Sequence, residues 1–301
     1  MCEFFSRKEN KMRQELKADL ALLSVTLVWG ISFPLISSAL KCVGPYTFLA
    51  LRYLTAAIIL FPMVFKRLKN IEKKTIKGGV FIGLSLFVGS ILQTVGLVYT
   101  TPSKSGFLTG INVVLVPIFI AIIYKNIPDL KSIIGVVLSI IGLAVMSLDG
   151  SMSMNLGDVL TIFSAVAFAI QILLVDKYAK NVDIVLMSCL QMFVIGILAL
   201  IPSIIVESAA LHINELTIGS ILFTAVFCTI YAFIIQNKMQ PYTNPTHAAV
   251  IFLAEPVFSA VFSTFIGDKL TGKTLKGCIF ILIGMIIINL KFEGKLIEVE
   301  E

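Results

Sequence analysis

The chain contains the stretch QTVGLVYTTP at residues 93–102 and the stretch QNKMQPYTNP at residues 236–245. Both follow the pattern Gln-x5-Tyr-Thr-x-Pro, one in each half of the chain. Each stretch joins two long apolar segments. With five apolar segments in each copy, the spacing predicts a duplicated unit. Because five is an odd number of spans, the second copy must enter a membrane from the opposite face.

Composition also indicates a membrane protein. Of the 301 residues, 57% are hydrophobic and 14% are charged, and the mean hydropathy is +0.97. A soluble domain is about half apolar and about a quarter charged, so this excess cannot be buried in one core. Apolar runs of about 20 residues, the length that crosses about 30 Å of hydrocarbon, recur along the chain. Continuous runs of this length predict helices, since barrel strands would be about ten residues long and would alternate.

We therefore predict an all-α integral membrane protein with ten transmembrane helices, arranged as two inverted five-helix repeats. The predicted spans are 18–40, 45–65, 76–98, 103–124, 131–148, 156–178, 182–206, 216–237, 246–266 and 274–291. The predicted organisation is a cytoplasmic N-terminal segment at 1–17, a first repeat at 18–148, an inverted second repeat at 156–291, and a cytoplasmic tail at 292–301. The first span is too long for a signal peptide and nine more follow it, so we expect it to be uncleaved.

The basic residues predict the orientation. If the N-terminus is cytoplasmic, eighteen Lys and Arg residues fall on the cytoplasmic side and five on the opposite side, with Arg52 left inside a span. This bias follows the positive-inside rule with both termini cytoplasmic. The net charge of +6 therefore reflects topology, and we expect no nucleic-acid partner.

The two halves also match outside the repeated stretch. Two slightly different alignments relate the halves. One of them aligns Ser32 with Gln171, and the other, which superposes the two repeated stretches, aligns Asn112 with Glu255. Inverted halves that exchange conformations convert an outward-open state into an inward-open one, which is alternating access. The alternative is that duplication only builds a large bundle.

Polar side chains at membrane depth are the candidate functional groups, because they are costly there unless satisfied. Glu255 is the strongest candidate, about 14 Å into its span at 1.5 Å per residue. Its carboxyl group could bind a proton or a substrate amine, or it could hydrogen-bond between helices. Arg52 lies about 10 Å from the outer boundary and within reach of Glu255 for an ion pair. Its alternatives are an architectural role or snorkelling to the interface.

The other candidates are amides, hydroxyls, aromatic rings and helix-bending residues. The further substrate-binding candidates are Trp29, Ser32, Phe33, Gln93, Asn112, Gln171 and Tyr231. The amides and Ser32 can bind a zwitterionic solute, or tie helices together for about 1 kcal/mol each. The aromatic residues Trp29, Phe33 and Tyr231 can line the cavity, or only pack between helices. The candidates for structural or gating roles are Gly30, Pro34, Arg52, Pro102, Pro117, Pro245 and Pro256. Glycine can instead serve only close helix packing.

The sequence lacks the motifs of several other protein classes. It has no GxxxxGK[ST] loop, no HExxH and no nucleotide-binding fingerprint. Its five cysteines show neither a CxxC pair nor metal-ligand spacing. We therefore expect no enzyme activity, no cofactor, no metal and no use of ATP. A membrane-embedded lipid carrier or flippase, or an exchanger of nucleotide-sugar-like solutes with the same fold, stays open as the alternative function.

Three motifs resemble the EamA type of the drug/metabolite transporter superfamily. They are Trp29-Gly30-x-Ser32-Phe33-Pro34, Phe48-x3-Arg52-Tyr53 and Ala254-Glu255-Pro256, and the resemblance extends from about residue 18 to 291. It implies ten helices and a central cavity lined mainly by spans 1, 3, 4, 6, 8 and 9. It also implies transport of small metabolites without ATP, often amino-acid export. The family often carries an acidic residue just after spans 4 and 9, whereas this chain has Lys125 or Asn126 at the first place and Asp268 at the second.

Together these observations predict a secondary transporter in the cytoplasmic membrane that moves a small metabolite, an amino acid or related solute, by alternating access. Export is the expected direction. The expected partners are a small-molecule substrate and the lipid bilayer, with proton coupling through Glu255 or facilitated diffusion both open. The sequence leaves the substrate, the coupling ion and the oligomeric state open.

Overall fold

The computed structural model describes residues 2–100, 102–125, 128–147, 154–207, 214–265 and 271–289. Some residues in the helices are described by their backbone alone, and Pro34 and Pro102 are among these residues. Asp268 and the predicted tail at 292–301 also lie outside the described residues. Every regular element in the described ranges is helical, in agreement with the predicted all-α class.

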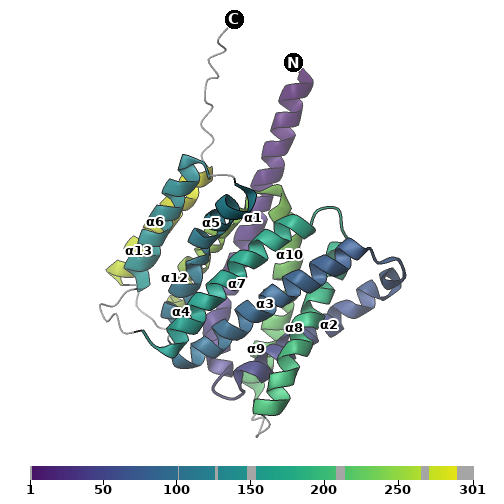
Figure 1. The fold of residues 1–301 in the computed structure, drawn as a ribbon. Coiled ribbons are helices and arrows are strands. Elements are labelled where there is room, and N and C mark those ends of the chain that lie inside the picture. Colours follow the sequence, from purple (N-terminus) through teal and green to yellow (C-terminus); the bar gives the residue numbers. More distant parts are fainter. Residues whose placement is uncertain are drawn as a thin grey trace, which may run out of the picture.

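Within its described residues, the first half of the chain has six α-helices and one short 3-10 helix (Figure 1). They are α1 (Cys2–Ala39), α2 (Pro45–Val64), η1 (Phe65–Asn70), α3 (Lys73–Tyr99), α4 (Pro102–Gly110), α5 (Asn112–Tyr124) and α6 (Leu130–Ser147). Helix α1 starts well before the predicted span because no glycine or proline interrupts its polar first turns. The predicted span 103–124 is divided into α4 and α5.

The second half contains further divided helices. Its elements are α7 (Leu156–Tyr178), α8 (Ile184–Val206), α9 (Glu215–Ala225), η2 (Val226–Tyr231), α10 (Ala232–Met239), η3 (Gln240–Tyr242), α11 (Pro245–Phe252), α12 (Ala254–Phe265) and α13 (Gly272–Asn289). Element η2 is a π-helix that joins α9 and α10 into one continuous rod. The predicted span 246–266 is divided into α11 and α12.

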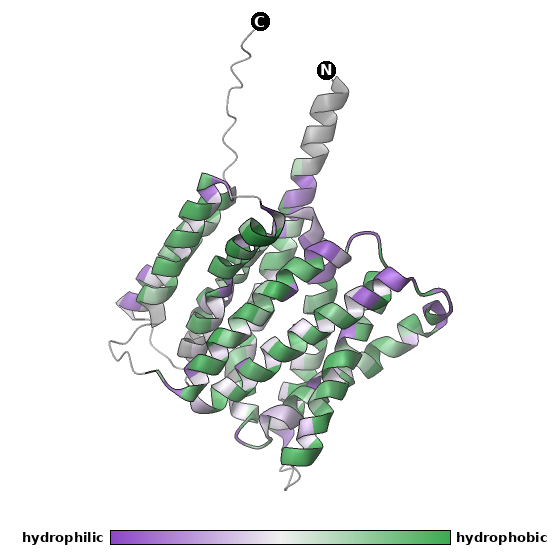
Figure 2. Cartoon of the chain, viewed as in Figure 1, coloured by the Kyte–Doolittle hydropathy of each residue, from purple (hydrophilic) through white to green (hydrophobic). Residues whose placement is uncertain are grey.

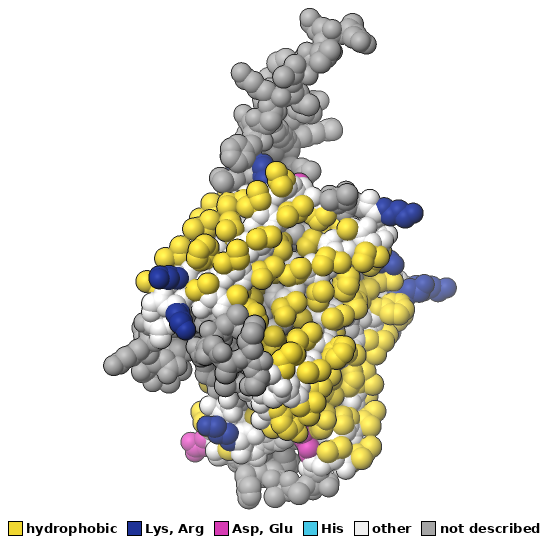
Figure 3. Space-filling model, turned by 60° about the vertical axis from the view of Figure 1, so that its left-hand side comes forward, with side chains coloured by type: hydrophobic (Ala, Val, Ile, Leu, Met, Phe, Trp, Pro, Cys, Tyr) yellow, Lys and Arg dark blue, Asp and Glu magenta, His cyan; other side chains and the backbone are white. Residues whose placement is uncertain are grey.

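Apolar side chains cover the outside of the helical bundle. Ile58, Ile122 and Ile205 are exposed by 65%, 69% and 73%. Figure 2 shows hydrophobic residues along most of each helix, with polar residues gathered near the helix ends. Figure 3 shows a broad hydrophobic surface on one face, with lysine and arginine side chains at its edges. Exposed apolar surface of this extent indicates a lipid-facing protein.

Within the described residues, seven helices are long and apolar enough to cross a membrane. They are Met12–Ala39, Pro45–Asn70, Lys73–Tyr99, Ser105–Ile123, Leu156–Tyr178, Ile184–Val206 and Glu215–Tyr242. Three predicted spans are not among them. Of these, 131–148 matches a shorter apolar helix, Leu130–Val145, whereas 246–266 and 274–291 extend past the described residues, which end at 265 and 289.

The helices of the two halves pack in matching pairs. Helix α6 packs along α13, and α2 packs along α8. Helix α3 lies against α7, while α1 lies against the α9–η2–α10 rod in the corresponding way. In Figure 1, α3 ends at the lower side, whereas the α9–η2–α10 rod rises to the upper side, so these two corresponding helices run in opposite directions. The N-terminal end of α1 and the C-terminal end of α13 lie on the same, upper side.

Carboxylates satisfy the free backbone N–H groups at two helix starts. The side chain of Asn155 accepts from the N–H of Asp158, whose carboxylate in turn accepts from the N–H of Asn155, and together they form a capping box for α7. The carboxylate of Glu207, at the end of α8, accepts from the N–H groups of Tyr46 (3.0 Å) and Thr47 (2.7 Å) in the first turn of α2. These bonds hold the sequence-distant helices α2 and α8 together.

The first copy of the repeated stretch joins α3 to α7. The hydroxyl of Thr100 donates to Asp158 Oδ1 at 2.7 Å, and the side chain of Asn155 donates to the carbonyl of Tyr99 at 2.9 Å. In the second copy, Pro245 begins α11 behind the capping side chain of Asn244. Each copy therefore runs from the last turns of one helix, α3 or α10, to the proline that begins α4 or α11, which agrees with its predicted place between two apolar segments.

Glycines bring α6 and α13 into backbone contact. A Cβ atom at Gly142 would lie 2.6 Å from the carbonyl oxygen of Gly277, and one at Gly284 would lie 2.6 Å from that of Gly135. Gly142 and Gly284 occupy matching places in the two halves, since each follows an isoleucine, Ile141 or Ile283, in the last helix of its half. Close approach of small residues is the usual means of packing helices in lipid.

We predict that Gly142→Ala destabilises the protein by about 1–3 kcal/mol, because the new methyl group would force the α13 backbone away. The measurement is the thermal unfolding temperature of the purified protein in detergent. Gly219→Ala in α9 is the matched control, since nothing lies within 4 Å of a Cβ atom there. Equal unfolding temperatures for the two variants would contradict the close α6–α13 contact.

Candidate functional site

The two divided helices meet at their interruptions. Helix α4 gives way to α5 at Ile111, and α11 gives way to α12 at Leu253. At both points the chain tightens, with the N–H of Ile111 bonded to the carbonyl of Leu108 and that of Leu253 bonded to the carbonyl of Val250. A Cβ atom at Gly110 would lie 2.8 Å from a methyl carbon of Leu253. The interruptions of the two repeats are therefore in contact.

Pro256 accounts for the interruption in the second repeat. A proline ring collides with the carbonyl four residues earlier in a continuous helix, and here that residue is Phe252, the last residue of α11. Pro256 itself lies in the first turn of α12, where its missing N–H would have had no intrahelical partner. Pro117 lies inside α5 and does not coincide with the interruption at Ile111.

Asn112 and Glu255 directly follow the two interruptions. Asn112 begins α5, and Glu255 is the second residue of α12. Neither side chain forms a hydrogen bond or ion pair with a described residue, yet neither has polar atoms sealed from water. Glu255 is only partly buried although its neighbours Leu253 and Ala254 are almost completely buried. Asn112 is buried, with 9% of its surface exposed, whereas the carboxylate of Glu255 is partly exposed and unbonded among the described residues.

A π-turn in the α9–η2–α10 rod releases a backbone carbonyl, which accepts from Trp29 and Arg52. The N–H of Ala232 bonds to the carbonyl of Phe227 instead of that of Cys228. The carbonyl of Cys228 accepts instead from Trp29 Nε1 at 3.0 Å and from Arg52 Nη2 at 3.1 Å. Single π-turns inside α-helices are frequent at functional sites.

Arg52 is held against the π-turn and is almost fully buried, with 8% of its surface exposed. Its Nε donates to the hydroxyl of Thr229 at 2.8 Å, and that hydroxyl donates to the carbonyl of Thr224 at 2.9 Å. The guanidinium carbon lies 5.2 Å from the ring centre of Tyr53. Nη1 forms no hydrogen bond within the described residues and is not sealed from water. Arg52 and Glu255, whose depths in the sequence placed them within reach of each other, form no ion pair within the described residues.

Trp29 connects the π-turn to the interrupted helix. Its ring centre lies 5.9 Å from that of Phe233 in α10 and 5.5 Å from that of Phe252 at the end of α11. The adjacent Gly30 allows α12 to approach, because a Cβ atom there would lie 2.8 Å from the carbonyl oxygen of Glu255. Trp29, Arg52 and Glu255, which are far apart in sequence, thus come from three helices to one region.

Other predicted site residues lie in packed contacts. Ser32 bonds to the carbonyl of its own helix at Trp29, and Phe33 is buried in α1. Gln93 Nε2 donates to the hydroxyl of Thr109 at 3.0 Å. Tyr231 shares a 2.7 Å hydrogen bond with Ser24. The contacts of Gln93 and Tyr231 fit the alternative interpretation that such groups tie helices together, whereas Ser32 bonds only within α1.

Gln171 belongs to a buried network of amides between α7, α8 and α10. Its Oε1 accepts from Gln236 Nε2 at 3.3 Å, and Gln236 also donates to Gln240 at 3.0 Å. The neighbouring Asn237 donates to Gln191 at 3.0 Å. In contrast to Asn112 and Glu255, these amides retain unpaired atoms that are sealed from water.

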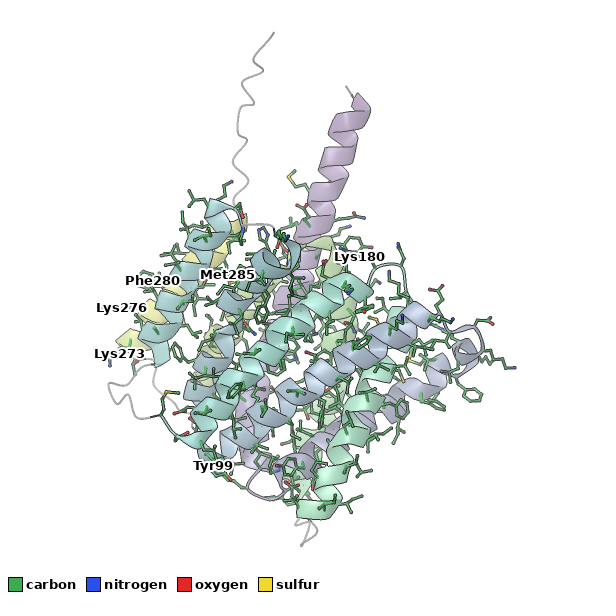
Figure 4. All side chains as sticks on the ribbon, in the orientation of Figure 1. Tyr99, Lys180, Lys273, Lys276, Phe280 and Met285 are labelled. Atoms are coloured by element: carbon green, nitrogen blue, oxygen red, sulfur yellow. The ribbon has the colours of Figure 1, made fainter. Side chains whose placement is uncertain are left out.

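Figure 4 shows all the described side chains on the ribbon, with Lys180 at the upper end of α7 and Tyr99 at the lower end of α3.

Sequence reasoning missed several groups of this region. The carbonyl of Cys228 and the hydroxyl of Thr229 could not be singled out, because no pattern in VFCTIY marks a π-turn. Asn237 and Gln191 were also missed, although an amide inside an apolar span is a signal that could have identified them.

We predict that Thr229→Val destabilises the protein by about 1–3 kcal/mol, because it removes the acceptor of a buried charged donor. Thermal unfolding of the purified variant in detergent measures the change. The matched control is Thr26→Val, since Thr26 is equally buried but bonds only to the carbonyl of Leu23 in its own helix. If Thr26→Val is as destabilised as Thr229→Val, the bond to Arg52 contributes nothing.

Comparison with known proteins identifies the family. The model of the EamA-like transporter family matches residues 16–148 and again residues 155–290. A protein of Archaeoglobus fulgidus described as an uncharacterized transporter is 35% identical over 279 residues, covering 92% of this chain and 87% of the relative. The uncharacterized transporter YvbV of Bacillus subtilis is 27% identical over 295 residues, covering 94% and 96%.

A solved structure described only as "Crystal structure of protein" superposes with a TM-score of 0.76, covering 90% of this chain and 96% of that one. At 16% sequence identity, this likeness concerns the fold alone. The family match covers nearly the whole chain in two consecutive repeats, and the relatives are named as transporters. The chain therefore belongs to the EamA-like transporter family of the drug/metabolite transporter superfamily and is a multi-pass membrane transporter.

Proposed function

We propose that this protein is a secondary transporter that exports a small metabolite, an amino acid or a related solute, across the cytoplasmic membrane. Transport proceeds by alternating access and needs no ATP. The substrate binds where the interruptions of the two repeats meet, near Asn112, Glu255 and Trp29.

The observation that carries this proposal is the contact between Gly110 and Leu253 at equivalent interruptions of two repeats. Interrupted helices expose unpaired polar groups in the middle of a bundle, which a rigid anchor or scaffold does not need. In secondary transporters, discontinuous helices at the repeat interface form the substrate site. The unpaired side chains of Asn112 and Glu255 at these two points support the same assignment.

The proposal includes a topology of ten spans in two inverted repeats, at 18–148 and 156–291, with both termini in the cytoplasm. Support comes from the opposite directions of α3 and the α9–η2–α10 rod and from the helix ends of α1 and α13 on one side (Figure 1). On this topology, Lys180 at the upper end of α7 is cytoplasmic, and Lys273 at the lower end of α13 faces outward (Figure 4).

In the same proposal, Glu255 is the coupling group if export is driven by protons. It is a titratable side chain without a bonded partner among the described residues, next to an interruption that can change shape. The proposal also includes substrate contacts in a second conformation of alternating access, after the helices have moved. The residues that make these contacts are Ser32, Phe33, Gln93, Gln171 and Tyr231.

We predict that purified protein in proteoliposomes exchanges at least one radiolabelled amino acid in counterflow without ATP, and that Glu255→Gln lowers the rate by about tenfold or more, because a charge-assisted contact is worth about 1.5–3 kcal/mol. Glu215→Gln is the control, since Glu215 is exposed in the first turn of α9. Counterflow of no metabolite, or full activity of Glu255→Gln, would refute the corresponding part of the proposal.

A further inference from the structure

Arg52 has more donors than its structural contacts use. Nε binds Thr229 and Nη2 binds the carbonyl of Cys228, and these two bonds are enough to hold the side chain against the π-turn. Trp29 already binds the same carbonyl, so that oxygen does not depend on Arg52 alone. Nη1 forms no hydrogen bond within the described residues, and it is not sealed from water.

Glu255 offers the opposite charge in the same region. The two side chains form no direct ion pair within the described residues. A short series of contacts connects Arg52 to Glu255. Arg52 and Trp29 bind one carbonyl oxygen, and the residue after Trp29 is Gly30, which packs on the backbone of Glu255.

A buried guanidinium group and a partly buried carboxylate at membrane depth are both unfavourable without further partners. A guanidinium group and a carboxylate in a low-dielectric interior each need hydrogen-bonded partners. Here Arg52 Nη1 and the carboxylate of Glu255 have none among the described residues. A ligand that carries a negative group and a positive group would satisfy both at once. Trp29, with its ring between Phe233 and Phe252, provides an apolar wall beside them.

We propose that Arg52 is a substrate-binding residue: its Nη1 binds an anionic group of the solute, and Glu255 binds a cationic group of the same solute. The inference rests on the proposed transport function and gives that function its selectivity for solutes with a carboxylate and an amino group. It assigns Arg52 a specificity role in place of the purely architectural one expected from the sequence.

The test measures binding by thermal stabilisation of the purified full-length protein. The twenty proteinogenic amino acids are tried one at a time, and each stabilising amino acid is then compared with the amine that lacks its carboxylate and the acid that lacks its amino group. We expect wild-type protein to bind both analogues about 10- to 100-fold more weakly than the amino acid, the range for loss of one charged hydrogen bond. Equal binding of the amine would overturn the role of Arg52, and equal binding of the acid would overturn that of Glu255.

Two variants make the assignment residue by residue. Arg52→Gln should weaken binding of the amino acid and the acid but not of the amine, and Glu255→Gln should weaken binding of the amino acid and the amine but not of the acid. Misfolding cannot produce this crossed pattern, because it would weaken all three ligands together. The matched controls are Arg67→Gln and Glu215→Gln, whose side chains are exposed and distant from the π-turn. If each variant weakens all three ligands equally, the proposal is wrong.

If Arg52→Gln does not fold, Arg52→Lys replaces it, because the ammonium group keeps the positive charge without the bidentate geometry. Arg52→Lys should keep the preference for the amino acid over the amine in reduced form, and a complete, unchanged preference would count against Arg52. Counterflow separates this inference from the proposed function. Exchange of neutral or cationic solutes alone would leave transport standing and overturn the charge assignment, whereas exchange of nothing would refute transport itself.

Discussion

A backbone group released within a membrane-spanning helix must find its partner inside the protein, because lipid offers none. The π-turn in the α9–η2–α10 rod releases the carbonyl of Cys228, and the side chains of Trp29 and Arg52 bind it. This single acceptor draws α1 and α2 toward the second repeat. The positions of the aromatic ring and of the guanidinium group, and therefore the arrangement of the candidate site, follow from it.

The two repeats use the same plan with different chemistry. In the register that relates Ser32 to Gln171, Arg52 corresponds to Gln191, and in the register of the repeated stretch Glu255 corresponds to Asn112. One side of the pseudo-symmetric arrangement thus holds two charged groups, and the other holds two neutral amides. In the first repeat α3 continues as a regular helix where the second repeat has its π-turn. Duplication supplied the frame, and divergence at a few positions made the two sides chemically unequal.

The amide network between α7, α8 and α10 shows how uncharged polar groups connect helices in this bundle. Gln171, Gln236 and Asn237 join α7, α8 and α10 through bonds between uncharged groups, which are worth about 1 kcal/mol each in membrane proteins. Bonds of this strength hold helices in register and are readily exchanged for water when helices separate. The close glycine contacts between α6 and α13 are different, because backbone touches backbone there and little movement is tolerated. The bundle therefore combines a tightly packed pair with a region whose contacts can be replaced.

The sequence by itself determined the helical class, the two repeats, the family and the apolar segments, because hydropathy and spacing report how much of a chain can be buried in lipid. It also identified Glu255, since an acid inside an apolar span is conspicuous. It did not determine the interruptions at Ile111 and Leu253 or the π-turn, because these depend on which neighbouring helices can accept the released backbone groups. For the same reason only the tertiary structure decided that Gln171 is bonded in a buried amide network while Glu255 has no bonded partner among the described residues. It also brought Trp29, Arg52 and Glu255, from three separate helices, to one region, which no local pattern could encode.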